Sequence, residues 1–154
     1  MDERTQLFQQ VTHLFNNILG KFQAIENKPR DFGTGDLLSR SEIHVLAGID
    51  ENPLASVTDL AGKLGVTKGA ISQMVGKLSG KGYVRKLHSV DDKKEILLAL
   101  TAKGRLAAEN HNEFHKQMFV LYCKDLSTEE AKTFLNILER IEKFTDDYLA
   151  QKFS

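Results

Sequence analysis

Two of the five histidines are spaced in a way that suits metal binding. His111 and His115 are four residues apart in a segment with helical periodicity. Side chains at positions i and i+4 lie on one face of a helix, where both can reach the same ion. Such a pair on a helix is more often simply solvated, and His44 would join it only if the two helices pack together. The pattern therefore indicates a candidate metal site that depends on the fold.

The distribution of charge indicates a second kind of chemistry. The chain has 21 Lys and Arg and 21 Asp and Glu, for a formal net charge of zero. Residues 56–100 hold eight basic and four acidic side chains, a net charge of +4, which leaves 13 basic and 17 acidic residues, or −4, elsewhere. A neutral protein that concentrates positive charge in one segment has the distribution expected for phosphate contact.

Hydrophobic periodicity and capping residues define the elements that would position these groups. A long amphipathic helix is predicted over residues 4–28 and ends at Pro29, and residues 29–38 read as a linker. Ser, Thr and Gly at cap positions predict further helices. The remaining predicted elements are helices over 39–49, 57–64, 68–79, 101–123 and 127–150, and a β-hairpin of strands 83–87 and 95–100.

The tight turn Gly65-Val66-Thr67 joins two of these helices in a helix-turn-helix pattern, whose second helix would enter the DNA major groove. Its apolar side would pack on the preceding helix, while Ser72 and Gln73 on the other side could contact bases. Gly69 and Gly76 lower the helix propensity, and either close approach to DNA or close helix packing would explain them. The candidate DNA-binding residues are Thr67, Lys68, Gly69, Ser72, Gln73, Lys77, Arg85, Lys93 and Lys94.

The fold class predicted from these elements is mostly α with a small β-wing, a winged helix-turn-helix core between long terminal helices. The terminal helices carry wide apolar stripes that must be buried against something, which favours a homodimer over a monomeric bundle.

The chain lacks the nucleophile, phosphate-loop and zinc-protease motifs of common enzymes, so we expect no catalytic activity. It also lacks a long apolar run and a signal-like N-terminus, so we expect a cytoplasmic location without membrane contact.

The chain resembles the MarR family of winged-helix regulators over essentially its whole length. The resemblance rests on the helix-turn-helix in 57–80, the run Gly82-Tyr83-Val84-Arg85, the wing tip Asp91-Asp92-Lys93-Lys94 and the pair Leu100-Thr101. It implies one domain over 1–154, with a DNA-binding lobe at 39–101 and a dimerisation lobe formed by 1–38 and 102–154. It also implies double-stranded DNA with a pseudo-palindromic operator as the partner. Lys94 stands where the family usually has Arg, which puts strong minor-groove contact by the wing in doubt.

The resemblance is greatest to the zinc-uptake repressors of this family. Their zinc ligands fall on Glu26, His44, His111 and His115, a donor set that suits tetrahedral zinc and would also accept nickel, cobalt or copper. A second, weaker site of those repressors does not carry over, because its ligand positions hold residues that cannot bind zinc, namely Phe32, Ile43 and Asn110.

The alternative to zinc is an organic effector. Other relatives bind phenolic or other aromatic effectors in the crevice between the lobes and then release DNA. Phe15, Phe22, Phe32 and His44 could line such a crevice here. A redox switch is disfavoured because the first helix has no Cys, and Cys123 is expected to be an inert thiol in apolar surroundings.

Overall fold

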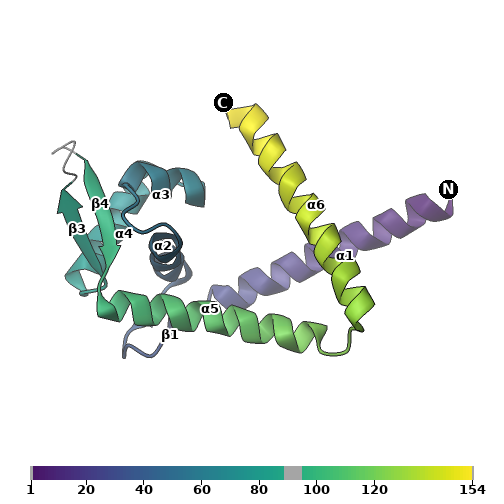
Figure 1. The fold of residues 1–154 in the computed structure, drawn as a ribbon, viewed down its shortest axis with the longest axis horizontal. Coiled ribbons are helices and arrows are strands. Elements are labelled where there is room, and N and C mark those ends of the chain that lie inside the picture. Colours follow the sequence, from purple (N-terminus) through teal and green to yellow (C-terminus); the bar gives the residue numbers. More distant parts are fainter. Residues whose placement is uncertain (1, 89–94, 154) are drawn as a thin grey trace. The chain divides into compact units, whose positions relative to one another are not determined.

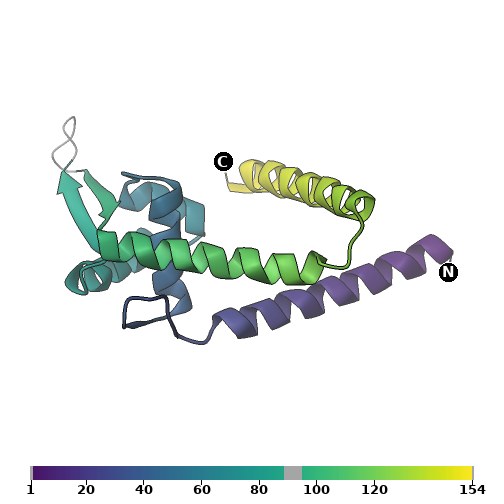
Figure 2. The same ribbon diagram turned by 60° about the horizontal axis from the view of Figure 1, so that its bottom comes forward.

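The computed structural model describes residues 2–88 and 95–153 and shows a mostly helical protein with a small two-stranded wing, as predicted (Figures 1 and 2). The chain divides into two compact units, Met1–Glu113 and Phe114–Ser154. This boundary falls inside a helix, and the division into lobes 39–101 and 1–38 with 102–154 stays a prediction. The elements are α1 (Glu3–Glu26), β1 (Arg30–Asp31), β2 (Leu37–Leu38), α2 (Arg40–Glu51), α3 (Val57–Leu64), α4 (Lys68–Gly80), β3 (Val84–His88), β4 (Ile96–Leu100), α5 (Ala102–Cys123) and α6 (Thr128–Phe153).

Side-chain caps begin α2, α3 and α4 where the sequence predicts them. Ser39 and Ser56 each form a reciprocal capping box with the acidic residue three positions later. Thr67 caps α4 by accepting a hydrogen bond from the Ala70 amide. Gly65 ends α3 in the left-handed conformation with φ of 65°, which costs glycine little. The predicted helix-turn-helix is confirmed.

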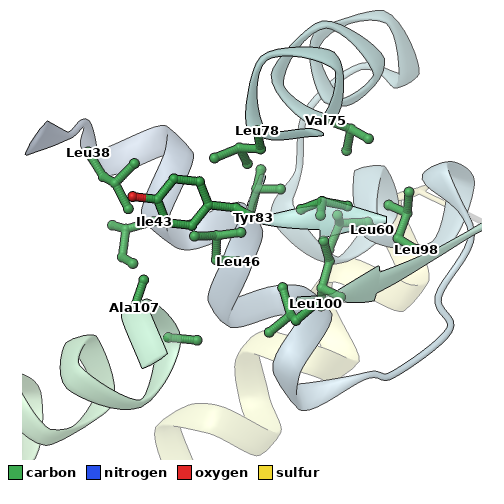
Figure 3. Close-up of a cluster of buried hydrophobic side chains, with 14 of the residues drawn as sticks. Leu38, Ile43, Leu46, Leu60, Val75, Leu78, Tyr83, Leu98, Leu100 and Ala107 are labelled. Atoms are coloured by element: carbon green, nitrogen blue, oxygen red, sulfur yellow. The ribbon is translucent and has the colours of Figure 1, made fainter. Parts of the chain in front are cut away.

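One hydrophobic core holds the helix-turn-helix and the wing together (Figure 3). α2 lies in its middle and contacts both α3 and α4, as well as β4 of the wing. α4 contributes its predicted apolar side, of which Ile71, Val75 and Leu78 are buried. This burial fixes which side of α4 faces outward. The largest fully buried side chains are Tyr83, Leu38, Leu46, Ile49, Leu60, Ile71, Leu78, Leu98, Val45 and Val75.

The wing is an antiparallel hairpin whose inner strand also bonds to the segment before α3. β3 and β4 pair in the register Val84↔Leu100 through His88↔Ile96. On its other side, Leu98 of β4 donates its amide to the Ala55 carbonyl at 3.0 Å. The wing tip, which includes Lys93 and Lys94, lies outside the described residues. β4 is therefore bonded to β3 on one side and to the segment before α3 on the other, which attaches the wing to the body of the domain.

The predicted linker over 29–38 contains a short β-hairpin. β1 and β2 form a short antiparallel pair with Arg30 opposite Leu38. The Asp31 carboxylate closes the turn between them by accepting hydrogen bonds from the Thr34 and Gly35 amides. Asn110 of α5 donates its side-chain amide to the Phe32 carbonyl at 2.9 Å, and Figure 2 shows this segment beside α5. The 30–38 segment is thus a hairpin attached to α5.

The two terminal helices expose their apolar residues. Every residue of α1 remains at least partly exposed, and Leu14 has 60% of its surface accessible. In the second unit, α6 begins at the predicted Ser127–Glu130 capping box. Large apolar side chains along α6 are also exposed, with Phe144 at 70%. Each helix therefore presents apolar surface in the single chain.

None of the helices in the described part of the chain combines the length and the apolarity that a membrane span requires.

Candidate DNA-binding surface and effector site

The outward side of α4 carries the predicted polar residues. Ser72, Gln73 and Lys77 are exposed, while Met74 and Ala70 are half-buried against the core. A side chain on this face can reach base edges or phosphates without leaving the helix. Of the nine candidate DNA-binding residues, the structure places seven on the exposed surface: Thr67, Lys68, Gly69, Ser72, Gln73, Lys77 and Arg85.

Gly69 and Gly76 of α4 have no packing role in the described part of the chain. An added Cβ at Gly69 would meet only the Thr67 Oγ1 atom, at 3.9 Å, and one at Gly76 would meet nothing within 4 Å. Both positions are exposed. Of the two explanations left open by the sequence, close helix packing is therefore disfavoured, and close approach of a ligand to the α4 backbone gains support.

Two of the basic residues counted in the positive segment are engaged within the protein. Lys63 forms an ion pair with Glu51 at 2.6 Å, and Lys81 forms one with Glu42 at 2.8 Å. The hydrogen bond to Glu42 raises the pKa of Lys81 above its ordinary value. Both acidic partners lie outside residues 56–100, so the local excess of positive charge is smaller in the folded protein than in the sequence count.

Three of the four candidate metal ligands lie together in the first unit. The His44 Nε2 atom is 3.7 Å from the Glu26 Oε2 atom, and the rings of His44 and His111 have centroids 5.4 Å apart. His111 is buried, with 7% of its surface exposed, and its ring meets Phe32 edge-on. α2 thus brings His44 beside His111 of α5, as a shared metal site would require.

The fourth candidate, His115, is half-buried and belongs to the second unit. Arg40 donates from Nε to Glu26 Oε2 at 2.8 Å, so this carboxylate already has a cationic partner. Within the part of the chain that the structure describes, no three side chains of the metal-binding types are grouped as they would be around a bound ion. The donor types fit zinc, since one carboxylate and imidazole nitrogens are among its usual ligands. Zinc binding itself stays a prediction.

A polar cluster at the base of the wing has no counterpart among the predicted residues. The Tyr83 hydroxyl lies 2.6 Å from the Thr34 Oγ1 atom and 2.9 Å from the Asp36 Oδ2 atom, and Lys103 donates to the same Asp36 oxygen at 2.7 Å. Asp36 lies in the supposed linker, 47 residues from Tyr83 in the sequence. No periodicity or motif links residues so far apart, so the sequence alone gave no signal for this cluster.

A helix-turn-helix followed by a two-stranded wing, with an exposed polar face on the second helix, defines the winged helix-turn-helix class of DNA-binding domains. Residues 38–96, which span β2 to the start of β4, match the MarR family. The chain is 33% identical over 113 residues to the HTH-type transcriptional regulator YhjH of Bacillus subtilis, covering 71% of this chain and 64% of that relative. It is 27% identical over 139 residues to the multiple antibiotic resistance protein MarR of Escherichia coli, covering 85% and 96%.

Solved structures agree with this assignment. FabT of Streptococcus pneumoniae, determined in complex with DNA, has 27% identity and a TM-score of 0.73, covering 95% of this chain and 99% of that one. The MarR family regulator SP03579 has a TM-score of 0.78 at 17% identity, covering 97% and 96%, and supports the fold alone. Residues 38–96 thus match the MarR family, and the relatives named here are transcriptional regulators rather than enzymes. The chain spans slightly less than two thirds of the length of YhjH.

Proposed function

We propose that this protein is a homodimeric, sequence-specific DNA-binding repressor whose affinity for its operator is raised by zinc. The observation that carries the DNA-binding part is the exposed polar face of α4, which displays Ser72, Gln73 and Lys77 on a helix held by a buried opposite side. The similarity to FabT, which was determined in complex with DNA, supports the same part.

Some residues of α4 are suited to contact bases and others to contact phosphates. Gln73 suits a bidentate contact to adenine in the major groove, and Ser72 can serve a base or a phosphate. Lys77 and Lys68 supply charge-assisted phosphate contacts, which give affinity but little sequence information. Arg85 is exposed on β3 and would add a contact from the wing. Specificity therefore rests on Gln73, and the salt dependence of binding rests on the lysines.

The dimer is proposed from the uncovered apolar faces of α1 and α6. Exposed apolar side chains that recur along a whole helix are unusual for a protein that functions as a monomer. A two-fold dimer would cover such faces and present two α4 helices to half-sites about one helical turn apart. The operator is then expected to be pseudo-palindromic.

The DNA-binding part is tested by fluorescence anisotropy on a duplex from the region upstream of its own gene, against a scrambled duplex. Lys77→Ala should weaken binding to both duplexes and lower the salt slope by about 1. Gln73→Ala should reduce the preference for the upstream duplex, by ~1–3 kcal/mol for each lost bidentate contact. Lys124→Ala, which removes a lysine from the second unit, is the charge-matched control. Equal affinity of the wild type for both duplexes would contradict the proposal.

The zinc part rests on the neighbourhood of Glu26, His44 and His111, which come from three separate helices. With His115 they would supply the four ligands of a closed tetrahedral site. When bound, zinc would act as a structural cross-link, without redox chemistry. His44 belongs to α2, which contacts α4, so a constraint on His44 bears on the helix that reads DNA. An ion that binds the DNA-competent arrangement better shifts the population toward it.

The zinc part is tested by titrating the metal-stripped protein with zinc and measuring stoichiometry and affinity. We expect one tightly bound ion per chain, and loss of that binding in His44→Ala and in His115→Ala. His13→Ala removes a histidine of α1 that is not a candidate ligand and serves as the control. Absence of tight binding by the wild type would overturn the zinc part and leave the DNA-binding part standing.

A further inference from the structure

Tyr83 combines complete burial with a hydroxyl in a polar cluster. Its side chain has 0% of its surface exposed, and Figure 3 shows it directed from the wing toward Leu38 and Ile43. The hydroxyl donates to the Asp36 carboxylate at 2.9 Å and lies 2.6 Å from the Thr34 hydroxyl. A phenylalanine would fill the same space in the core, so the hydroxyl has a role that packing alone does not require.

Lys103 completes the cluster from the first turn of α5. Its ammonium group is 2.7 Å from the Asp36 Oδ2 atom and 4.5 Å from the centroid of the Tyr83 ring. It also donates to the Lys81 carbonyl at 3.3 Å. The hydrogen bonds from Lys103 and Tyr83 lower the pKa of Asp36 below its ordinary value, so the carboxylate is charged and holds both groups at neutral pH.

The backbone of Tyr83 is the point where the DNA-reading elements join. Its amide donates to the Leu78 carbonyl in the last turns of α4 at 2.9 Å, and its carbonyl accepts from the Thr101 amide between β4 and α5 at 3.0 Å. Gly104 of α5 packs directly on that carbonyl, since an added Cβ there would lie only 2.2 Å from the oxygen. Tyr83 lies in the short connection between α4, which ends at Gly80, and β3, which begins at Val84. A shift of the Tyr83 backbone would therefore move the end of α4 and the start of the wing together.

We propose that Tyr83, Asp36 and Lys103 form a positioning network that sets the orientation of the wing relative to α4 for DNA binding. The inference rests on the proposed DNA-binding function. It states that DNA binding also requires residues that lie away from the DNA-contacting face. The 30–38 hairpin supplies the fixed end of the network, because its attachment to α5 through Asn110 holds Asp36 beside the base of the wing.

The test compares Tyr83→Phe and Asp36→Ala with the wild type and with Ile49→Val. Ile49 is buried in α2 outside the cluster, so Ile49→Val is a control that loses stability through packing alone. Thermal unfolding shows how far each variant is folded at the assay temperature. We expect both network variants to bind the upstream duplex about 2- to 30-fold more weakly, the range found for residues that couple to a distant site. Ile49→Val, once folded, should bind as the wild type does.

The salt dependence of DNA binding distinguishes positioning from stability. If the wing is displaced, its phosphate contacts are lost, and the salt slope of Tyr83→Phe should fall by about 1 for each lost contact. A change in stability alone leaves the slope of the folded protein unchanged. The double variant Tyr83→Phe with Asp36→Ala should be no worse than the more affected single variant, because both act through one network. Lys103→Arg should keep affinity, whereas Lys103→Met should lose it.

Failure of the inference and failure of the proposed function give different results. If the wild type prefers the upstream duplex and Asp36→Ala binds it equally well with the same salt slope, the network has no positioning role. Asp36→Ala decides this even if Tyr83→Phe does not fold, because Asp36 is partly exposed. If the wild type shows no preference for the upstream duplex, the proposed function fails and the inference fails with it.

Discussion

Gly69 is exposed in the first turn of α4, and an added methyl group there would meet only the Thr67 hydroxyl. We predict opposite effects of Gly69→Ala on stability and on DNA binding. Alanine is favoured over glycine within a helix by up to about 1 kcal/mol, so the free energy of unfolding should rise. The methyl group would obstruct close approach of the backbone to DNA, so affinity should fall. Denaturant unfolding and anisotropy on one sample measure both, and unchanged affinity would restore a purely structural explanation.

The Glu26 carboxylate forms an ion pair with Arg40 and also lies beside His44, where it is a candidate metal ligand. The guanidinium competes with any metal ion for that carboxylate. We predict that Arg40→Gln binds zinc about two- to fivefold more tightly, since a partly exposed ion pair is worth at most ~1 kcal/mol. Lys28→Gln removes one positive charge nearby in the sequence and is the control. Unchanged or weaker zinc binding by Arg40→Gln, measured by competition with a chelator, would contradict this role of Arg40.

Single residues were predictable where their partners are local and unpredictable where they are distant. The exposed face of α4 follows from helical periodicity, so the positions of Ser72 and Gln73 could be stated in advance. The pairing of Lys81 with Glu42 joins residues 39 apart, and no spacing in the sequence reveals it. The neighbourhood of His44 and His111 came from family resemblance, because spacing alone indicated only the pair His111 and His115.

A helix start depends on a cap residue and a partner within four positions of it in the sequence. The sequence therefore predicts where these helices begin. Each predicted cap of α2, α3 and α4 is formed by the Ser or Thr expected to form it. The β1–β2 pair was missed because each strand has two residues, too few for an alternating pattern to show. Its turn depends on hydrogen bonds to Asp31, and its position depends on contacts with α5, which is far away in the sequence.

The cap of α3 gives a prediction about stability and its pH dependence. Ser56 is buried, and its hydroxyl accepts from the Asp59 amide and donates to the Asp59 carboxylate at 2.7 Å. Ser56→Ala should lower the free energy of unfolding by about 1 kcal/mol, as is typical for loss of an N-cap. Chemical denaturation at neutral pH measures the change. Ser41→Ala, at an exposed position inside α2, should change stability by less than ~0.5 kcal/mol.

The hydrogen bonds from Ser56 lower the pKa of Asp59 below its ordinary value. The folded protein therefore binds this proton less readily than the unfolded chain does, and the resulting stability is present above about pH 4. It is lost as the pH falls through the lowered pKa. We expect the wild type to lose more stability than Ser56→Ala on acidification from pH 6 to pH 2. Parallel pH profiles for the two proteins would contradict this account of the cap.

At the scale of the whole molecule, the exposed apolar faces of α1 and α6 give a prediction about assembly. Leu14→Glu places a charge on the α1 face without disturbing the core of the first unit, because Leu14 is 60% exposed in the chain. We expect sedimentation velocity to show a dimer for the wild type and a monomer for Leu14→Glu. DNA affinity should fall by about 10²-fold or more, since the two half-sites would no longer be bound by one linked molecule.

Gln10→Glu adds the same charge at a polar position of α1 and should remain dimeric. A monomeric wild type, or a Leu14→Glu variant that stays dimeric with full DNA affinity, would show that this face of α1 has another role.

The central claim is that DNA binding by this protein is coupled to zinc. The most direct test is the dissociation constant for the upstream duplex, measured on metal-stripped protein with one equivalent of zinc per chain and again with excess chelator. Couplings between two binding sites are typically 5- to 150-fold, so we expect at least fivefold tighter binding with zinc. By reciprocity, the duplex should tighten zinc binding by the same factor. The same dissociation constant with zinc and with chelator would contradict the claim.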